Sequence, residues 1–484
     1  MGPRLLRVAP FVALMAWSGG AHADAPAATT ASSVAPPPDA AMAFGLPPAR
    51  KITLAEALAF ARDHQPAVRA ALAQIQTERA NADVPRAQYL PLIGITAQFL
   101  EGTANNTTAS YLGDPFVDLP RIGGTPSRTG HDAGWKPYAS TLGAAGLNQE
   151  LFDFGRIAAQ AAAADARVTV ATHAAAALRL DIALNVEEAF FAVHAARGVL
   201  DAAEGAYQRS LVHRDFANAG VKSGLRSPIE LTRAEADLTR FDTGRIRARG
   251  GLAAAQAVLA AAVGASDLRL DAADESPTPS DLPALRDAVQ AASDRDPRLR
   301  EALARLRQQE LETRAVGALN RPDVQLSATI SARAGGAAPS TGGAVPYGSG
   351  YLPDVPNWDG VLVLSWPLYD PTVGARERAS RASEEVQRSQ IDLVRQQVVA
   401  AVEQAYVGVV VSREALPALR RELDAARANY AQAEARFKAG LGTSVELADA
   451  EALRADAEIR VALGTFELAK ARAMFGRAVA DGLH

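Results

Sequence analysis

The chain has 484 residues, a formal net charge of −4 at pH 7 and no cysteine. This length exceeds what one ordinary hydrophobic core organises, so we expect several units or an elongated molecule. The lack of a basic excess argues against nucleic-acid binding, and the lack of cysteine excludes disulfides, thiolate metal sites and a cysteine nucleophile.

The N-terminal residues have the pattern of a secretory signal peptide. A basic start is followed by the short apolar run 8–17 and by the small-residue cleavage sequence AHA at 21–23. We therefore expect residues 1–23 to be removed during export. Residues 24–50 are rich in alanine and proline, which predicts a disordered lead-in. Because no cysteine follows the cleavage site, we expect no lipid at the mature N-terminus. No other run predicts a transmembrane helix.

The sequence contains a tandem repeat. Residues 221–235 read VKSGLRSPIELTRAE and residues 437–451 read FKAGLGTSVELADAE, with seven of fifteen positions identical. Further matching pairs precede them in the same order: 64–72 with 295–303, 89–99 with 320–330, and 151–155 with 368–372. The sequence therefore predicts two structural repeats, with these bounds: 51–264 for repeat 1, 265–282 for a linker, 283–476 for repeat 2 and 477–484 for a short tail.

Two strands are predicted in each repeat. The first strand of repeat 1 alternates apolar residues with small or polar ones over 93–99, and that of repeat 2 does so over 324–333. The second strands are expected at 139–151 and 358–368. About ten residues suit a tilted strand that crosses a bilayer. Aromatic residues near the strand ends favour membrane interfaces: Tyr89, Tyr138, Phe152, Phe154, Trp358, Trp366 and Tyr369. A soluble sandwich sheet alternates in the same way, so the strands alone leave both interpretations open.

The predicted strand number adds a constraint. Single-chain membrane barrels start at about eight strands, so the strands predicted in one chain do not close a barrel. An open sheet in lipid would expose unpaired edges. Either the sheet is soluble or several chains share one barrel, and three chains would supply 4 × 3 = 12 strands, roughly the size of known barrels.

The remaining sequence predicts helices, two of them very long. Residues 155–219 contain no proline, and small or apolar residues recur in steps of four and three: Ile157, Ala161, Ala164, Val168, Ala171, Ala175, Leu178 and Ile182. This is a heptad seam, and a helix of that length extends about 97 Å. A returning helix is expected at 228–263, and repeat 2 has the same pair at 373–438 and 444–475. Shorter single helices are expected before the first strands, at 53–85 and 283–316.

Two Gly-Leu turns join the long helix pairs. Gly224 and Gly440 suit the left-handed conformation that ends a helix. Each following helix carries the capping-box pattern of a hydroxyl residue and a glutamate three positions later: Ser227 with Glu230, and Thr443 with Glu446. We therefore expect both glutamates to close their own helix N-termini, each cap contributing about 1 kcal/mol.

Three further residues near these turns have two interpretations each. Asp449 lies one turn beyond the cap, where capping needs no acid, and repeat 1 has Arg233 at the matching position. It is either a solvated charge on a helix face or part of a functional acidic site. Leu225 and Leu441 are apolar residues at the tips of the turns. They either pack back on their own helices or dock another helical hairpin.

Together these features resemble the TolC family of outer-membrane factors. The resemblance covers nearly all of the predicted mature chain, and its most specific parts are RAQYLPLI (86–93), LFDFGR (151–156), the two Gly-Leu stretches and the duplication itself. It implies an α+β membrane protein of Gram-negative bacteria. The family fold is a homotrimer with a shared 12-stranded outer-membrane β-barrel and a long α-helical coiled-coil barrel in the periplasm. The implied partners are a periplasmic adaptor protein and an inner-membrane transporter.

The resemblance also assigns roles to residues of the turns. Glu446 and Asp449 match the positions whose acids ring the periplasmic mouth, and such a ring attracts cations and narrows the opening. The turn residues match the adaptor contact: Gly224, Leu225, Gly440 and Leu441. The gating arginine of the family matches Gly442 here, and Arg226 holds the equivalent place in repeat 1.

We therefore expect an exit channel of a tripartite efflux system that passes small molecules across the outer membrane. The alternatives are the outer-membrane component of a type I protein secretion system and, from another class, a soluble periplasmic coiled-coil protein. The sequence has no HExxH motif and no phosphate-binding glycine loop after a strand, so no enzymatic activity, cofactor or metal site is expected. The transported substrate, the pump and the adaptor are not decided by the sequence.

Overall fold

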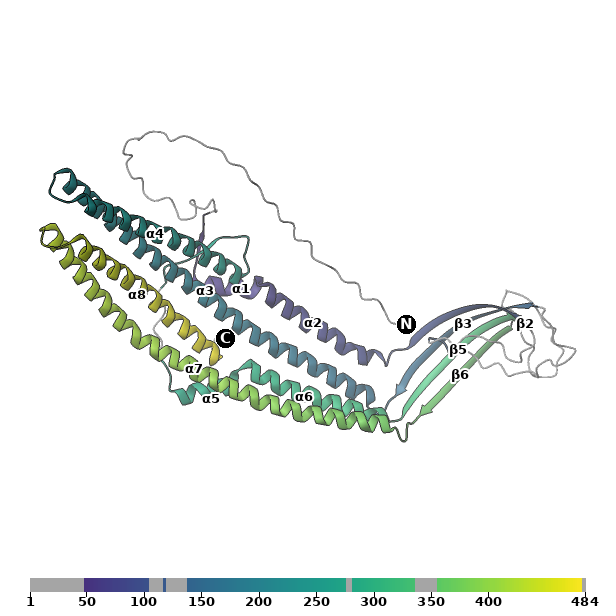
Figure 1. Ribbon diagram of the computed structural model, residues 1–484. Coiled ribbons are helices and arrows are strands. Elements are labelled where there is room, and N and C mark those ends of the chain that lie inside the picture. The colour runs from purple at the N-terminus through teal and green to yellow at the C-terminus, as the bar shows by residue number, and fades with distance from the viewer. Residues whose placement is uncertain (1–47, 104–115, 119–136, 276–280, 336–354, 481–484) are drawn as a thin grey trace, which may run out of the picture. The chain divides into compact units, whose positions relative to one another are not determined.

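The computed structural model describes residues 48–103, 116–118, 137–275, 281–335 and 355–480 (Figure 1). The predicted signal peptide lies outside these residues, as do the predicted lead-in up to residue 47 and the last four residues of the tail. Within the described part, helices dominate and a smaller share of the chain forms strands. This composition agrees with the predicted α+β class.

The described elements follow the same order in both predicted repeats. Repeat 1 contains α1 (Leu54–His64), α2 (Pro66–Ala87), β2 (Leu92–Thr103), β3 (Pro137–Phe152), α3 (Arg156–Lys222) and α4 (Pro228–Val263). Repeat 2 contains α5 (Leu285–Arg295), α6 (Pro297–Gly317), β5 (Asp323–Gly335), β6 (Val355–Ser365), α7 (Pro371–Lys438) and α8 (Ser444–Ala478), with a short 3₁₀ turn at Ala318–Asn320. One buried cluster draws on α1, α3 and α4, and another draws on α5, α7 and α8. Each repeat therefore has a core of its own.

The prediction of one helix before each first strand was wrong, because each of these segments forms two helices. Pro66 and Pro297 occupy the first position of α2 and α6. The preceding residues, Gln65 and Asp296, have ψ angles of 121° and 120° and therefore leave the helical region. A proline ring clashes with a helical conformation at the residue before it, so both segments break at the same place in the repeat.

A two-stranded parallel sheet was not predicted. One of its strands begins at the last residue of the predicted lead-in and continues into repeat 1, and the other lies in the predicted linker. β1 (Arg50–Ile52) pairs with β4 (Leu270–Ala272). Arg197 of α3 donates to the Asp271 carboxylate and to the Ala272 carbonyl at 2.7 and 2.9 Å, which fastens β4 to the long helix. Strands of three residues are too short to show an alternating pattern, so sequence periodicity gave no signal for them.

The main sheet is antiparallel with the strand order β2-β3-β5-β6, so its central pairing joins the two repeats (Figure 1). Ile95, Ala145, Ile330 and Trp358 align across the four strands in one row. Their face is open: Ile95 is 83%, Ile330 72% and Trp358 80% exposed. The opposite face carries the buried residues Thr96, Leu142, Ala144, Thr329 and Ser331, of which Leu142 alone is a large apolar residue. The sheet therefore exposes its apolar face, the reverse of a soluble sandwich.

Residues 116–118 lie against the small-residue face of this sheet. Val117 is buried, and the Thr329 hydroxyl donates to the Asp118 carbonyl at 2.8 Å. A Cβ atom added at Gly94 would lie 2.5 Å from the Phe116 Cβ, and one added at Gly146 would lie 2.9 Å from Val117. These glycines permit the close approach of the segment to the sheet, since any larger residue would displace it.

The LFDFGR motif forms the turn from β3 into α3. Phe154 and Gly155 have φ angles of 52° and 87°, so the link from β3 to α3 passes through a left-handed conformation. The Asp153 carboxylate then accepts hydrogen bonds from the Gly155 N–H at 3.1 Å, the Tyr89 hydroxyl at 2.9 Å and the Ile157 N–H. Asp153 is buried, and it satisfies free N–H groups at the start of the longest helix of repeat 1.

The long helices have the predicted extent. α3 spans 67 residues, or about 100 Å, and α7 spans 68 residues. α3 packs against α2, α4, α6 and α8, so residues on several of its faces are buried. The predicted heptad seam accounts for only part of these contacts. Val168, Ala171 and Leu178 of that seam are half-buried, and its other members are buried.

Among the described helices, α4 alone is long and apolar enough to qualify as a candidate membrane span. This is weak evidence, since core helices meet the same criterion. Its residues Leu252, Leu259 and Val263 belong to the core of repeat 1. Packing within the protein therefore accounts for part of the apolar composition of α4, of whose most apolar window 33% is buried.

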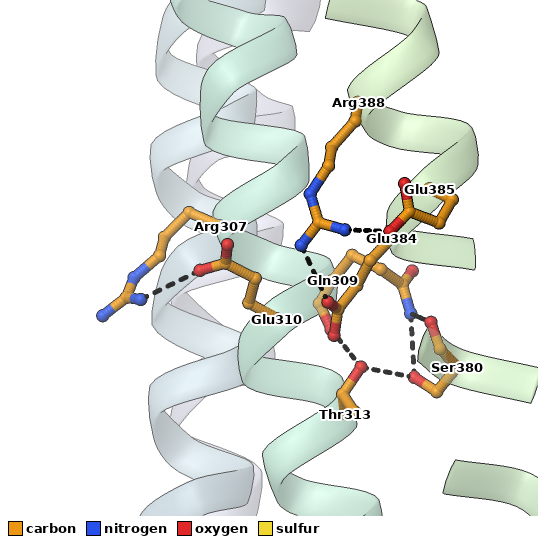
Figure 2. Close-up of polar contacts among 8 residues, drawn as sticks. All are labelled: Arg307, Gln309, Glu310, Thr313, Ser380, Glu384, Glu385 and Arg388. Carbon is orange, nitrogen blue, oxygen red and sulfur yellow. Dashed lines mark hydrogen bonds and ion pairs between the residues drawn. The ribbon is translucent and has the colours of Figure 1, made fainter. Parts of the chain in front are cut away.

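Polar contacts join α6 to the first part of α7 (Figure 2). The Gln309 amide of α6 donates to the Ser380 hydroxyl of α7 at 2.9 Å, and the Thr313 and Ser380 hydroxyls lie 2.8 Å apart. Arg388 pairs with Glu384 and Glu385 on its own helix, and Arg307 pairs with Glu310 on α6. The small Ser380 side chain lets the two helices approach, while the ion pairs remain within each helix.

Candidate functional site at the two hairpin turns

The two Gly-Leu turns have the same backbone geometry. The first hairpin is α3 with α4, and the second is α7 with α8. Gly224 and Gly440 have φ angles of 73° and 74°, as expected for left-handed glycines after a helix. In the first turn, the N–H groups of residues 225 and 226 donate to the Gly220 carbonyl at 2.9 and 3.1 Å. In the second, those of residues 441 and 442 donate to the Arg436 carbonyl at the same distances.

The tip leucines are open to solvent. Leu225 is 84% exposed and Leu441 is 75% exposed, so within one subunit neither packs back on its own helices. Each lies at the outermost point of a turn between two long helices. This arrangement presents an apolar side chain on a rigid support, as a docking surface requires.

Only one of the two predicted helix caps forms. The Thr443 hydroxyl accepts a hydrogen bond from the Glu446 N–H at 3.2 Å, but the Ser227 hydroxyl makes no capping bond. In the first turn, the Glu230 N–H donates instead to the Ser227 carbonyl at 3.0 Å. The Glu230 carboxylate pairs with Arg226 at 2.7 Å and does not return to its helix N-terminus. Arg226 has no counterpart in the second turn, where Gly442 stands. The Glu446 carboxylate likewise makes no hydrogen bond to the start of its helix among the described residues, so the prediction that both glutamates close capping boxes was wrong.

This difference predicts unequal effects of two matched substitutions. Thr443→Ala should weaken the first turn of α8 by about 1 kcal/mol, because an N-cap hydrogen bond is lost. Ser227→Ala should leave the first turn of α4 nearly unchanged. Amide hydrogen exchange at Glu446 and Glu230 would measure both effects. Equal acceleration at the two sites would contradict the geometry described here.

Glu446 and Asp449 lie on one exposed face of α8. They are three residues apart, a spacing that places side chains next to each other on a helix. Among the described residues, neither carboxylate has a hydrogen bond or an ion pair. Arg233, which repeat 1 has in place of Asp449, is also exposed. The second hairpin therefore presents two free acids near its tip, and the first hairpin does not.

Arg226 connects the two hairpins. Its guanidinium donates to the Phe437 carbonyl of α7 at 3.0 Å and lies 4.0 Å from the centre of the Phe437 ring. The same group lies 5.1 Å from the ring of Phe216 in α3. Phe437 is buried with Tyr430, Leu447 and Ala450 in a small apolar cluster of the second hairpin. The first turn thus reaches the core of the second hairpin through one side chain.

A second connection between the hairpins lies deeper along the helices. Arg209 of α3 donates through Nε to both carboxylate oxygens of Glu451 in α8, at 2.8 and 2.9 Å, and lies 3.4 Å from Glu458. Glu451 is only 1% exposed. Burial raises the pKa of Glu451, and Arg209 only partly offsets this effect. Sequence analysis missed this pair, because residues distant in the sequence form it and the repeated stretch that ends at Glu451 gives no sign of a partner on α3.

A histidine and a tyrosine accompany the buried pair. His213 Nε2 of α3 lies 2.9 Å from the Tyr430 hydroxyl of α7. Burial, followed by the nearby carboxylates of Glu451 and Glu434, raises the pKa of Tyr430 to about 12. Burial lowers the pKa of His213. The neutral forms of both side chains are therefore favoured. Their contact adds α7 to the connection that Arg209 and Glu451 make between α3 and α8.

Comparison with known proteins agrees with this arrangement. The family model of the outer membrane efflux protein matches residues 58–265 and 288–477, which is most of the chain. The chain belongs to the outer membrane efflux protein family. The two matched segments overlap the two predicted repeats, 51–264 and 283–476. Membership in an efflux family agrees with a transport role.

Individual relatives resemble this outer membrane efflux protein in sequence or in fold. The chain is 27% identical to Protein CyaE of Bordetella pertussis over 413 residues, which cover 84% of this chain and 80% of that protein. The CmeC outer membrane channel of Campylobacter jejuni matches with a TM-score of 0.70 and 13% identity, over 89% of this chain and 86% of that chain. The MtrE outer membrane channel of Neisseria gonorrhoeae, solved in an open state, matches with a TM-score of 0.64 and 19% identity, over 89% of both chains.

Proposed function

We propose that this efflux protein is the exit channel of a tripartite system in the outer membrane of a Gram-negative bacterium. The observation that carries the proposal is the reversed sheet, with an apolar row open and hydroxyl and small residues covered. A sheet with its apolar face outward suits contact with lipid, and its small, polar face suits the inside of a pore. A soluble periplasmic coiled-coil protein would not place Ile95, Ile330 and Trp358 in water.

The sheet edges support a homotrimer. β2 and β6 each pair on one side only among the described strands. Unpaired backbone groups are not tolerated in hydrocarbon, so each edge needs a partner strand. Pairing of β6 with β2 of the next subunit satisfies both edges, and three subunits give a closed barrel of 4 × 3 = 12 strands.

The hairpin turns are the proposed periplasmic end of the channel. They lie at the ends of α3 and α7 opposite to those that follow the strands, about 100 Å along each helix. The exposed tips, Gly224 with Leu225 and Gly440 with Leu441, are the proposed contact with a periplasmic adaptor, which links the channel to an inner-membrane transporter. In the proposed trimer, the free acids Asp449 and Glu446 of the three subunits form a ring of negative charge at the periplasmic mouth. The chain carries no N-terminal lipid in this proposal.

Conduction in a planar bilayer tests this function. The purified protein should form discrete cation-selective channels, and Asp449→Ala should reduce selectivity because a ring of fixed negative charge is removed. Glu446→Ala should do the same to a smaller extent, and Arg233→Ala is the matched control on the first hairpin. A folded trimer that gives no channel in a bilayer, and no export of small molecules from cells, would count against the proposal. Export of an unfolded protein alone would favour type I secretion.

A further inference from the structure

Residues 116–118, called the wall segment here, lie across one row of the main sheet. The row consists of aligned residues of the four strands: Gly94, Gly146, Thr329 and Asp359. Each of them is next in sequence to a residue of the open apolar row that contains Ile95 and Ile330. Because neighbouring residues of a strand point to opposite faces, the row lies on the other face of the sheet. In the proposed trimer this is the lumen face of the barrel.

The wall segment packs on this row without a gap. A Cβ atom added at Gly94 would lie 2.5 Å from the Phe116 Cβ and 2.9 Å from the Phe116 carbonyl oxygen. One added at Gly146 would lie 2.9 Å from the Val117 Cγ1 and 3.2 Å from the Val117 Cα. Glycine at these two positions therefore lets the backbone of the segment lie flat on β2 and β3.

Hydrogen bonds fix the same segment to β3 and β5. The Asn148 amide donates to the Phe116 carbonyl at 3.4 Å, and the Thr329 hydroxyl donates to the Asp118 carbonyl at 2.8 Å. Both acceptors are backbone atoms, so these contacts hold the course of the chain and not a particular side chain. The wall segment is thus fastened to the sheet at both of its ends.

The wall segment lies well inside the sheet and not at its outer end. Gly94 is the third residue of β2, counted from the end that follows α2, and Thr329 is the middle residue of β5. β2 continues for nine residues beyond Gly94 to Thr103, which is about 30 Å at about 3.3 Å per residue. The contact therefore lies at the depth of the proposed barrel itself.

An added layer of chain matters in a barrel of this size. A barrel of about 8 strands is filled by its own side chains, and one of about 16 strands leaves an aqueous channel. The proposed barrel of 4 × 3 = 12 strands lies between these cases, so three wall segments narrow its lumen substantially. Val117 is buried between the segment and the sheet, whereas Phe116 is 53% exposed on the lumen side.

We propose that the wall segments of the three subunits form a constriction inside the barrel, and that the Phe116 side chains set the largest solute that passes through it. This proposal rests on the function proposed above. It places a size limit within the membrane part of the channel, apart from the periplasmic mouth and from the outer ends of the strands. Because backbone contacts hold the segment, the limit is a fixed property of the barrel and needs no opening step.

The size of a reagent that crosses the constriction from outside tests this proposal. Gln325 is exposed on the same face, on the helix side of Thr329. The chain has no cysteine, so Gln325→Cys supplies a single thiol. Maleimides linked to poly(ethylene glycol) of increasing length, added outside intact cells, should modify this thiol up to a limiting length. Phe116→Ala should increase that length, Phe116→Trp should decrease it, and Phe116→Tyr should leave it nearly unchanged.

The matched control lies on the other face of the same strand. Phe99 is 75% exposed next to the apolar row, so Phe99→Ala should leave the limiting length unchanged. Migration of each variant as a trimer on a gel checks its folding, and Phe116→Trp keeps the test decisive if Phe116→Ala does not assemble. A limiting length that is equal in Phe116→Ala, Phe116→Trp and Phe99→Ala overturns the constriction. So does a Gln325→Cys thiol that no reagent reaches in Phe116→Ala.

Two further cysteine variants separate failure of the constriction from failure of the channel function. Ile95→Cys should resist every water-soluble maleimide in the membrane, because this position faces lipid in the proposed barrel. Its rapid modification would show that the channel function fails, and the constriction with it. Cysteines at Gly146 and Val117 would have Cβ atoms 3.3 Å apart, close to the separation in a disulfide. If they form no disulfide in a trimer whose Ile95→Cys is protected, the wall segment does not lie on the sheet although the channel stands.

Discussion

Replacing Arg209 with methionine should destabilise the folded protein by about 3–5 kcal/mol, because a buried carboxylate is left without its partner. Among the described residues, Arg209 is the only side chain that donates a hydrogen bond to Glu451. Chemical unfolding of the purified protein in detergent measures the loss. Since burial already raises the pKa of Glu451, removal of the arginine should raise it further.

The unfolding free energy of this variant should depend on pH, because the unpaired Glu451 carboxylate can take up a proton. Burial holds the pKa of Glu451 above the ordinary value of 4.5 in the unsubstituted protein, and loss of the Arg209 charge should raise it further in Arg209→Met. The folded state then binds a proton more readily than the unfolded state, so the variant should regain stability as the pH falls from neutral towards that value. If the difference in unfolding free energy between Arg209→Met and the unsubstituted protein does not change over this pH range, the destabilisation does not come from the buried charge.

A matched pair of variants separates charge from packing. In Glu451→Leu, Arg209 retains Glu458 at 3.4 Å, so the expected loss is smaller than in Arg209→Met. The double variant Arg209→Met/Glu451→Leu removes both charges and should recover much of the stability, as buried ion pairs replaced by apolar residues often do. A double variant as unstable as Arg209→Met would mean that shape, and not charge, holds α3 against α8.

Sequence analysis predicted those elements whose boundaries are set by local chemistry. Helix α4 was predicted at its observed bounds, and Pro228 occupies its first position as the sequence indicated. In the structure Gly264, with a φ angle of 84°, follows its last residue. The strands were found because apolar and small residues alternate along them. The reversed orientation of the sheet was not decided by that alternation, since a soluble and a lipid-facing sheet give the same pattern.

Contacts between distant segments could not be predicted from local patterns. The pairing of β3 with β5, which joins the two repeats, has no signal in either strand alone. Glu235 and Glu451 occupy matching positions of the repeated stretch, but Glu235 is exposed and Glu451 is buried against Arg209. Likewise, the capping pattern at Ser227 was misread because Arg226 competes for Glu230. Identical local sequences therefore acquired different roles through their neighbours.

Replacing Asp153 with asparagine should also destabilise the protein, by about 2–3 kcal/mol, because hydrogen bonds to a charged acceptor become bonds to a neutral one. The carboxylate is buried at the start of α3 and accepts from the Tyr89 hydroxyl and from the N–H groups of Gly155 and Ile157. It lies just beyond the last residue of β3, where the proposed barrel meets the helical part. Tyr89→Phe removes one of the three donors and should cost less.

The acid sensitivity of this cap follows from its pKa. Burial alone would raise the pKa of Asp153, but the N–H groups of Ile157 and Gly155 and the Tyr89 hydroxyl outweigh it and lower the pKa below the ordinary 3.8. A lowered folded-state pKa gives stability that is fully present above the unfolded value and is lost as the pH falls through the folded value. The difference in unfolding free energy between the unsubstituted protein and Asp153→Asn should therefore be constant near neutral pH and shrink below about pH 4. A difference that stays constant into this acidic range would show that the carboxylate is not the ionised acceptor that starts α3.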